Sequence, residues 1–236
     1  MLDRLTITGP DDNTNIDRLL QLSEQFPFLE WAILYSPTRE GSNRYPSQAW
    51  RTNFEDACKG TRVQRAMHLC GNAVKTFVLH GPEATPRSNY QRVQLNFSAL
   101  SKNWTPVMLE QMVLQCERAE KGDGAPQQII IQANRSNKEV LPLFDRLGNK
   151  IHVLYDSSGG NGKVIDTFEG PILGKYCGYA GGITPDNALA LYQRITCVND
   201  HSFWMDLETG VRTKNDQWDQ HKVNTLVHTL SFVIGR

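Results

Sequence analysis

The sequence has no excess of charge of either sign, because its 25 Lys and Arg residues balance its 25 Asp and Glu residues. General nucleic-acid binders usually carry a basic excess, so this balance argues against that class. The sequence also lacks any apolar run near the roughly 18 residues that are needed to cross a bilayer. We therefore expect neither nucleic acid nor a membrane as a partner.

Cysteine pairs with the CxxC spacing of zinc or redox sites are also missing. The cysteines are odd in number and scattered along the chain: Cys58, Cys70, Cys116, Cys177 and Cys197. No cluster of His, Asp and Glu has the spacing of metal ligands, and polar residues stand where a signal peptide would have its apolar core. These features predict reduced thiols, a cytoplasmic location, no metal and no cofactor.

The sequence does contain a regular alternation of short β-branched apolar segments with helical patterns. Its 236 residues are 39% hydrophobic and 21% charged, as in ordinary globular proteins. Strands are predicted over residues 5–8, 31–35, 66–70, 92–97, 128–131, 151–156, 176–180 and 203–206. Eight strand–helix units in a chain of this length predict an α/β fold, a (β/α)₈ TIM barrel forming one domain over residues 1–236. A doubly wound sheet obeys the same alternation and is the rival.

Several helices carry clear start signals. Asp12 or Asn13 is expected to cap the first helix. Thr105 and the following proline begin the helix after the fourth strand. A capping box formed by Ser136 and Glu139 predicts the start of the helix after the fifth strand, which is expected to end near residue 148. Further helices are expected over residues 47–58, 74–79, 187–195 and 222–232.

Polar residues gather where the strands end, which is the face of such a barrel that carries the active site. This predicted ring contains two carboxylates, Asp156 and Asp206, and the thiol of Cys70. His68 precedes Cys70 by two residues, so both side chains are expected on the same side of their strand. A Cys/His pair can act as a base or nucleophile if the pKa of the thiol is lowered, although burial in the barrel is the more common fate of a cysteine.

The last loops are rich in glycine, which lets backbone N–H groups approach an anion closely. Loops after the seventh and eighth strands form the usual phosphate site of TIM barrels. The predicted phosphate-binding residues are Gly160, Gly162, Gly181, Gly182, Thr209 and Gly210.

Three blocks of this sequence resemble phosphoribosylanthranilate isomerases: LYD followed by GGNGK, AGGITPDN, and MDLETGV. They follow in the same order and at nearly the same spacing as in that family, and the clear match covers residues 151–211. Residues 42–47 and 93–95 resemble it in patches. The resemblance implies an Amadori rearrangement of a phosphoribosyl compound. In that reaction a carboxylic acid protonates the furanose ring oxygen, and a base removes a proton from the opened imine.

The resemblance also implies roles for single residues. Asp156 falls on the general acid of the family, and the glycine loops fall on its phosphate site. Arg44 falls on a substrate-contacting arginine, with Arg39 as a competing alignment. Thr8 stands where the family has a cysteine base, and a hydroxyl is a poor base near neutral pH.

The fourth strand reads Gln94-Leu95-Asn96 where the family usually has a histidine, so Gln94 and Asn96 are expected at the substrate, together with Thr8 and Asp206. We expect an isomerase-like, or less readily lyase-like, enzyme acting on a small phosphorylated sugar derivative. The main alternative is a barrel that binds or senses such a ligand without catalysis, and a structural barrel is a third possibility.

Overall fold

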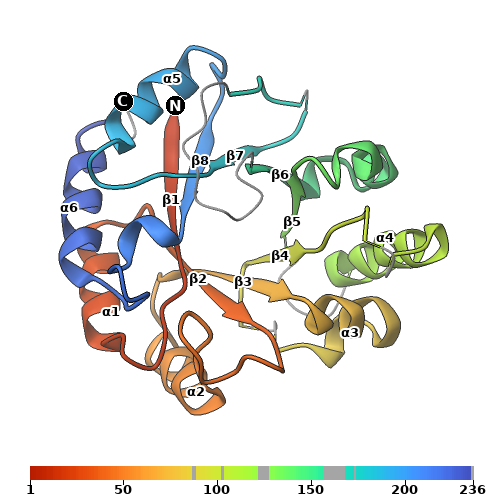
Figure 1. Cartoon of the computed structure of the whole chain (residues 1–236), viewed down its shortest axis with the longest axis horizontal. Coiled ribbons are helices and arrows are strands. Elements are labelled where there is room, and N and C mark those ends of the chain that lie inside the picture. The colour runs from red at the N-terminus through yellow and green to blue at the C-terminus, as the bar shows by residue number, and fades with distance from the viewer. Residues whose placement is uncertain (87–88, 102–103, 122–127, 157–167, 173, 235–236) are drawn as a thin grey trace.

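In the computed structural model, the chain forms a closed barrel of eight parallel strands in sequential order (Figure 1). The structure describes residues 1–236 except 87–88, 102–103, 122–127, 157–167, 173 and 235–236. The strands are β1 (Leu2–Thr8), β2 (Leu29–Tyr35), β3 (Gln64–Cys70), β4 (Arg92–Asn96), β5 (Gln128–Ala133), β6 (Ile151–Asp156), β7 (Cys177–Ala180) and β8 (Phe203–Leu207). The barrel closes where β8 pairs with β1. The predicted TIM barrel is thereby confirmed, and the doubly wound sheet is not the fold.

Helices surround this barrel on the outside (Figure 1). The α-helices are α1 (Ile16–Gln25), α2 (Gln48–Ala57), α3 (Asn72–His80), α4 (Pro106–Lys121), α5 (Ala188–Thr196) and α6 (Gln220–Ser231). Short 3₁₀ segments are η1 (Pro82–Ala84), η2 (Lys138–Lys150) and η3 (Thr209–Val211). Their buried apolar side chains join those of the strands in one large core, because each helix must cover an apolar stripe. No described helix combines the length and the apolar character that a membrane crossing requires.

The helix start at Thr105 is confirmed, whereas two other predicted helix starts are wrong. The Thr105 hydroxyl accepts a hydrogen bond from the backbone amide of Met108. The first helix, however, is capped by Asn15, whose side chain accepts from the amide of Arg18. Asp12 does not cap it, because its carboxylate instead accepts from the backbone amide of Ser47.

The predicted capping box at Ser136 does not form. The Ser136 hydroxyl donates to the side chain of Asn134, and the following segment is the 3₁₀ segment η2 rather than an α-helix. Pro142 lies within η2 and cannot donate the backbone hydrogen bond that an α-helix needs. The sequence signal at Ser136 therefore marked a turn, not a capped α-helix.

The interior of the barrel is unusually polar for a TIM barrel. Glu30 on β2 and Arg92 on β4 form an ion pair of 2.9 Å with both side chains fully buried. The Arg92 guanidinium also lies 4.1 Å from the ring centre of Trp204 on β8. Since these contacts cross the barrel, they occupy its centre below the strand ends. The charges of Glu30 and Arg92 influence the pKa values of ionisable groups at the strand ends above them.

Candidate functional site

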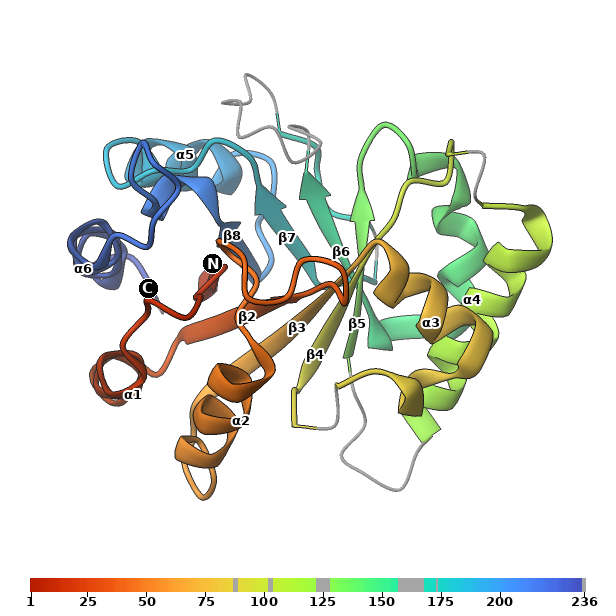
Figure 2. The same cartoon turned by 60° about the horizontal axis from the view of Figure 1, so that its bottom comes forward.

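The candidate site is a cavity of about 1070 Å³ at the carboxyl ends of the strands. In Figure 2 the arrowheads of β6 and β7 point to the same edge of the molecule, where this opening lies. The residues of the predicted site that line the cavity are Thr8, His68, Gln94, Asn96, Asp156, Gly181, Gly182, Asp206, Thr209 and Gly210. Side chains from five strands therefore meet at one opening, together with the loops after β7 and β8.

The two carboxyl groups lie at the same height on strands separated by one neighbour. Asp156 on β6 pairs with Ala180 on β7, and Ala180 pairs with Asp206 on β8. Two strand spacings place the Cα atoms of the two aspartates roughly 10 Å apart. Both side chains are buried, and both line the cavity. Both carboxyl groups therefore belong to the same region of the cavity wall.

Asp206 is held from one side only. The hydroxyl of Thr8 donates to its Oδ1 over 2.8 Å, whereas its Oδ2 has no hydrogen-bond partner among the described residues. Burial raises the pKa of Asp206 to about 8, and the hydrogen bond from Thr8 acts in the opposite direction. Near neutral pH this carboxyl group therefore exists in both protonation states, as a group that accepts and returns protons should.

His68 is close to Asp206 but does not share a hydrogen bond with it. Its Nε2 lies 3.8 Å from Oδ2 of Asp206 and is unpaired within the described structure. Burial lowers the pKa of His68 to about 3, and the positive charge of Arg92 adds to this effect. His68 is therefore neutral at physiological pH and presents polar ring atoms rather than a charge.

Cys70 is separate from the cavity. It is absent from the described residues that line it, and its thiol accepts a hydrogen bond of 3.2 Å from the side-chain amide of Asn96. Burial raises the pKa of the Cys70 thiol to about 11, opposite to the shift that a catalytic thiolate needs. The hypothesis of a Cys70/His68 base therefore gains no support from the geometry, since neither group is a ready proton acceptor at neutral pH.

The glycine loops approach the cavity with their backbones. Gly181 and Gly182 have φ angles of 116° and 64°, a conformation that side-chain-bearing residues rarely adopt. Gly210 packs so closely on the next loop that a Cβ atom would lie 1.8 Å from the carbonyl oxygen of Ile183. The amides of Gly182 and Gly210 donate to no other described residue, which leaves them available to a ligand. Gly160 and Gly162 lie outside the described residues.

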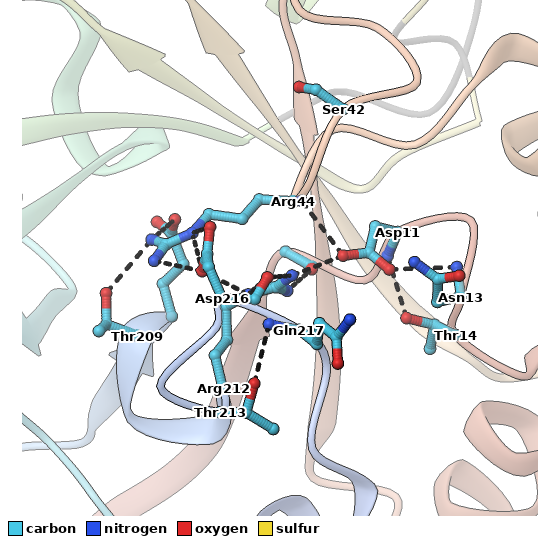
Figure 3. A network of polar contacts seen from close by, with 12 residues as sticks. Asp11, Asn13, Thr14, Ser42, Arg44, Thr209, Arg212, Thr213, Asp216 and Gln217 are labelled. Atoms are coloured by element: carbon cyan, nitrogen blue, oxygen red, sulfur yellow. Dashed lines mark hydrogen bonds and ion pairs between the residues drawn. The ribbon is translucent and has the colours of Figure 1, made fainter.

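Arg44 does not line the cavity in the part of the chain that the structure describes. Its guanidinium contacts Asp216 and Glu208 and donates to the hydroxyl of Thr209 over 3.2 Å (Figure 3). Arg39 is also engaged elsewhere, over the ring of Tyr45. Arg44 therefore braces the segment that carries Thr209, rather than reaching for a ligand directly.

Five titratable residues of the described cavity lining are absent from the predicted site: Arg135, Asp186, Glu208, His221 and Lys222. Lys222 is the first residue of the helix that the sequence predicts over residues 222–232, and His221 directly precedes it. Lys222 extends its amino group to the carbonyl oxygen of Arg212 over 2.6 Å. The sequence position of Lys222 could have identified it, because α6 begins close to the loop that follows β8. Within the described residues, no group of His, Cys, Asp or Glu is arranged to hold a metal ion.

Comparison with protein-family models gives no match, and comparison with curated protein sequences gives none either. Solved structures do match. The phosphoribosyl anthranilate isomerase of Thermotoga maritima superposes with a TM-score of 0.63 at 16% identity, covering 99% of this chain and 100% of the other. TrpF from Jonesia denitrificans gives 0.62 at 14% identity, covering 98% and 97%. A phosphoribosyl anthranilate isomerase in complex with reduced 1-(o-carboxyphenylamino)-1-deoxyribulose 5-phosphate (rCdRP) gives 0.60 at 16% identity, covering 99% and 100%.

These likenesses extend over almost the whole of each chain. At such low identity they show a shared fold, a single (β/α)₈ barrel of the kind found in phosphoribosyl anthranilate isomerases. The resemblance seen in the sequence is confirmed at this level.

Proposed function

We propose that this chain binds a small phosphorylated sugar derivative at the barrel mouth and isomerises it. The observation that carries the proposal is a single cavity lined both by two buried carboxyl groups, Asp156 and Asp206, and by the glycine loops after β7 and β8. The carboxyl groups supply proton transfer to a sugar, and the loops supply anion binding.

The phosphate end of the ligand is assigned to the loops. The amides of Gly182 and Gly210 are available there, and the Thr209 hydroxyl lines the same wall. Lys222 adds a positive charge from the first turn of α6. Backbone amides together with one lysine form a typical environment for a phosphate group.

Asp156 is assigned as the acid that opens the sugar ring. Its carboxylic acid gives a proton to the ring oxygen of an N-glycosidic pentose. The bond between that oxygen and the anomeric carbon breaks with its electron pair on oxygen, while the nitrogen lone pair forms a C=N⁺ bond. The step yields an open-chain hydroxyl, an iminium ion and the Asp156 carboxylate, so that charge and atoms balance.

The test uses rCdRP as the ligand and phosphoribosyl anthranilate as the substrate. Solved structures with the same fold include phosphoribosyl anthranilate isomerases, one of them in complex with rCdRP. We expect calorimetry to detect rCdRP binding to the wild-type chain. Asp156→Asn is expected to lower kcat/KM by about 10²–10⁴-fold while rCdRP still binds. Asp145→Asn is the matched control, since the Asp145 side chain is 67% exposed and distant from the cavity lining. Absence of rCdRP binding to the wild type contradicts the proposal.

A barrel that only binds or senses the ligand is the second candidate. It is favoured by the hydroxyl of Thr8 at the end of β1 and by the high pKa of the Cys70 thiol, about 11, because neither group is a base near neutral pH. Binding of rCdRP without turnover at any pH would select this candidate.

A further inference from the structure

An isomerase that opens a ring to an iminium ion also needs a base, and the proposed function leaves this role unassigned. The base must lie at the same cavity as Asp156, within reach of the carbon next to the iminium carbon. Thr8 offers only a hydroxyl, and Cys70 lies away from the cavity lining with a protonated thiol. His68 lines the cavity, but its lowered pKa makes it a weak proton acceptor. Among the other described lining residues, Asp186 and His221 are exposed and Glu208 is paired with Arg44. The remaining buried carboxyl group beside Asp156 is that of Asp206.

The geometry of Asp206 suits proton transfer. The Thr8 hydroxyl fixes Oδ1 at 2.8 Å and so sets the orientation of the carboxyl plane. Oδ2 has no described partner, and the residue is only 5% exposed. An orphaned oxygen in a buried carboxyl group costs free energy unless something binds to it. A ligand in the cavity supplies such a partner.

The groups around Asp206 come from several strands and from the loop after β8. Thr8 on β1 donates to it, and His68 on β3 lies 3.8 Å away in its neutral form. The buried ion pair of Glu30 and Arg92 lies within the barrel, where the two charges act on Asp206 in opposite directions. Glu208 follows on the next loop and disfavours ionisation. Burial is the largest influence, and it raises the pKa of Asp206 to about 8, which matches a base that works near neutral pH.

We propose that Asp206 is the base of the reaction, with Oδ2 as the proton-accepting atom and Thr8 as its positioning residue. This assignment rests on the proposed function. In the step, the Asp206 carboxylate takes the proton from the carbon next to the iminium carbon. The C–H electron pair becomes the C=C bond of an enaminol, and the π pair of the C=N⁺ bond returns to nitrogen. Gain of a proton at the former iminium carbon and loss of the enol hydroxyl proton then give the ketone.

The first experiment compares Asp206→Asn with the wild type, using phosphoribosyl anthranilate for turnover and rCdRP for binding. Asparagine has the shape of the protonated aspartic acid and still accepts from Thr8, so the variant is expected to fold and to bind rCdRP. Its kcat/KM is expected to fall about 10²–10⁴-fold. Asp206→Glu restores an ionisable group and is expected to recover part of the loss. Asp200→Asn is the matched control, because Asp200 precedes the same strand at the opposite end and its side chain is 91% exposed.

The second experiment uses pH to separate a base from a residue that merely supports the fold. In the wild type, kcat/KM should rise with pH, with the midpoint of the rise (the limb of the pH profile) near pH 8. This is the pKa of Asp206 in the enzyme without substrate, which the pH dependence of kcat/KM reports. Thr8→Val removes the hydrogen bond that lowers this pKa, so the limb should move to higher pH. Thr8→Ser keeps the hydroxyl and should restore the wild-type position.

The outcomes distinguish this assignment from the proposed function. If rCdRP binds and the wild type turns over, but Asp206→Asn is as active as the wild type, the assignment is overturned and the function stands. A limb that Thr8→Val leaves in place overturns the positioning role of Thr8. Binding without wild-type turnover overturns the base assignment and leaves a binding protein. If rCdRP does not bind at all, both proposals fail.

Discussion

At the scale of the residue, Asp206 determines how the site responds to pH. Its carboxyl group is surrounded by the barrel wall and bonded only to Thr8 among the described residues. His68 lies 3.8 Å away, beyond hydrogen-bond distance, and burial together with the charge of Arg92 disfavours a positive charge on its ring. Folding therefore raises the pKa of the Asp206 carboxyl group from 3.8 to about 8.

This proton makes the stability of the fold pH-dependent. From about pH 4 to about pH 8 the native chain holds a proton on Asp206 that the unfolded chain releases near 3.8. The free energy of unfolding therefore falls as pH rises through this window, and the stabilising contribution is lost above it. Asp206→Asn removes this titration. Between pH 5 and pH 9, urea denaturation should show the wild type losing about 4 kcal/mol more than the variant, because each pH unit between 5 and 8 contributes about 1.4 kcal/mol.

The two proteins share every other ionisable group, so the difference between the two curves isolates Asp206. Asp200→Asn serves as the control, because a highly exposed carboxylate should leave the wild-type slope unchanged. Parallel curves for Asp206→Asn and the wild type would show that Asp206 ionises in the fold much as it does in the unfolded chain.

At the scale of the element, the two glycine-bearing loops after β7 and β8 depend on each other. Gly210 in η3 lies directly against the backbone of Ile183 in the loop after β7. A side chain at this position must push the loops apart, because a Cβ atom would lie 1.8 Å from the Ile183 carbonyl oxygen. The absence of a side chain at Gly210 therefore allows the two loops to pack against each other.

Gly210→Ala tests this coupling. We expect rCdRP to bind at least about tenfold more weakly, equivalent to about 1.4 kcal/mol, because the amides on both loops move away from the phosphate. Gly170→Ala is a suitable control, since its added Cβ would meet the carbonyl oxygen of Val198 at an ordinary 3.4 Å. Calorimetric affinities equal to that of the wild type for both variants would contradict the coupling.

At the scale of the whole molecule, the strand order and the position of the site could be predicted, since apolar segments recur eight times and parallel strands end on one face. That argument brought Asp156, Asp206 and the loop glycines to one rim. It could not predict the raised pKa of the Cys70 thiol, because this pKa depends on burial, which the spacing of residues in the sequence does not show. It also missed Lys222, which lines the cavity from the first turn of α6, next to η3.

The same limit applies to Arg44. Its ion-pair partner Asp216 lies 172 residues further along the chain, so only the closed barrel brings the two together. Local signals such as the one at Ser136 failed for the opposite reason, because a nearby side chain offered a better hydrogen bond than the helix start.

A buried guanidinium, that of Arg212, joins the loop after β1 to the segment after β8 (Figure 3). It donates to the carbonyl oxygen of Gly9 over 2.7 Å, to Asp11 over 2.5 Å and to Asp216 over 2.8 Å. A guanidinium satisfies these acceptors together because its donors point in several fixed directions. Lysine keeps the charge but has a single nitrogen, so at least one buried acceptor would lose its partner.

Arg212→Lys is therefore expected to lower the free energy of unfolding by about 1–3 kcal/mol, even though no charge is removed. Because Arg212 joins the loop after β1 to the segment after β8, the loss should appear in global unfolding by urea, not only in a local loop. Arg146→Lys is the control: the Arg146 side chain is 43% exposed and pairs with surface glutamates, so its change should remain within about 0.5 kcal/mol. If both variants unfold at the same urea concentration as the wild type, the barrel closes without help from this guanidinium, and the hydrogen bonds between β8 and β1 are sufficient.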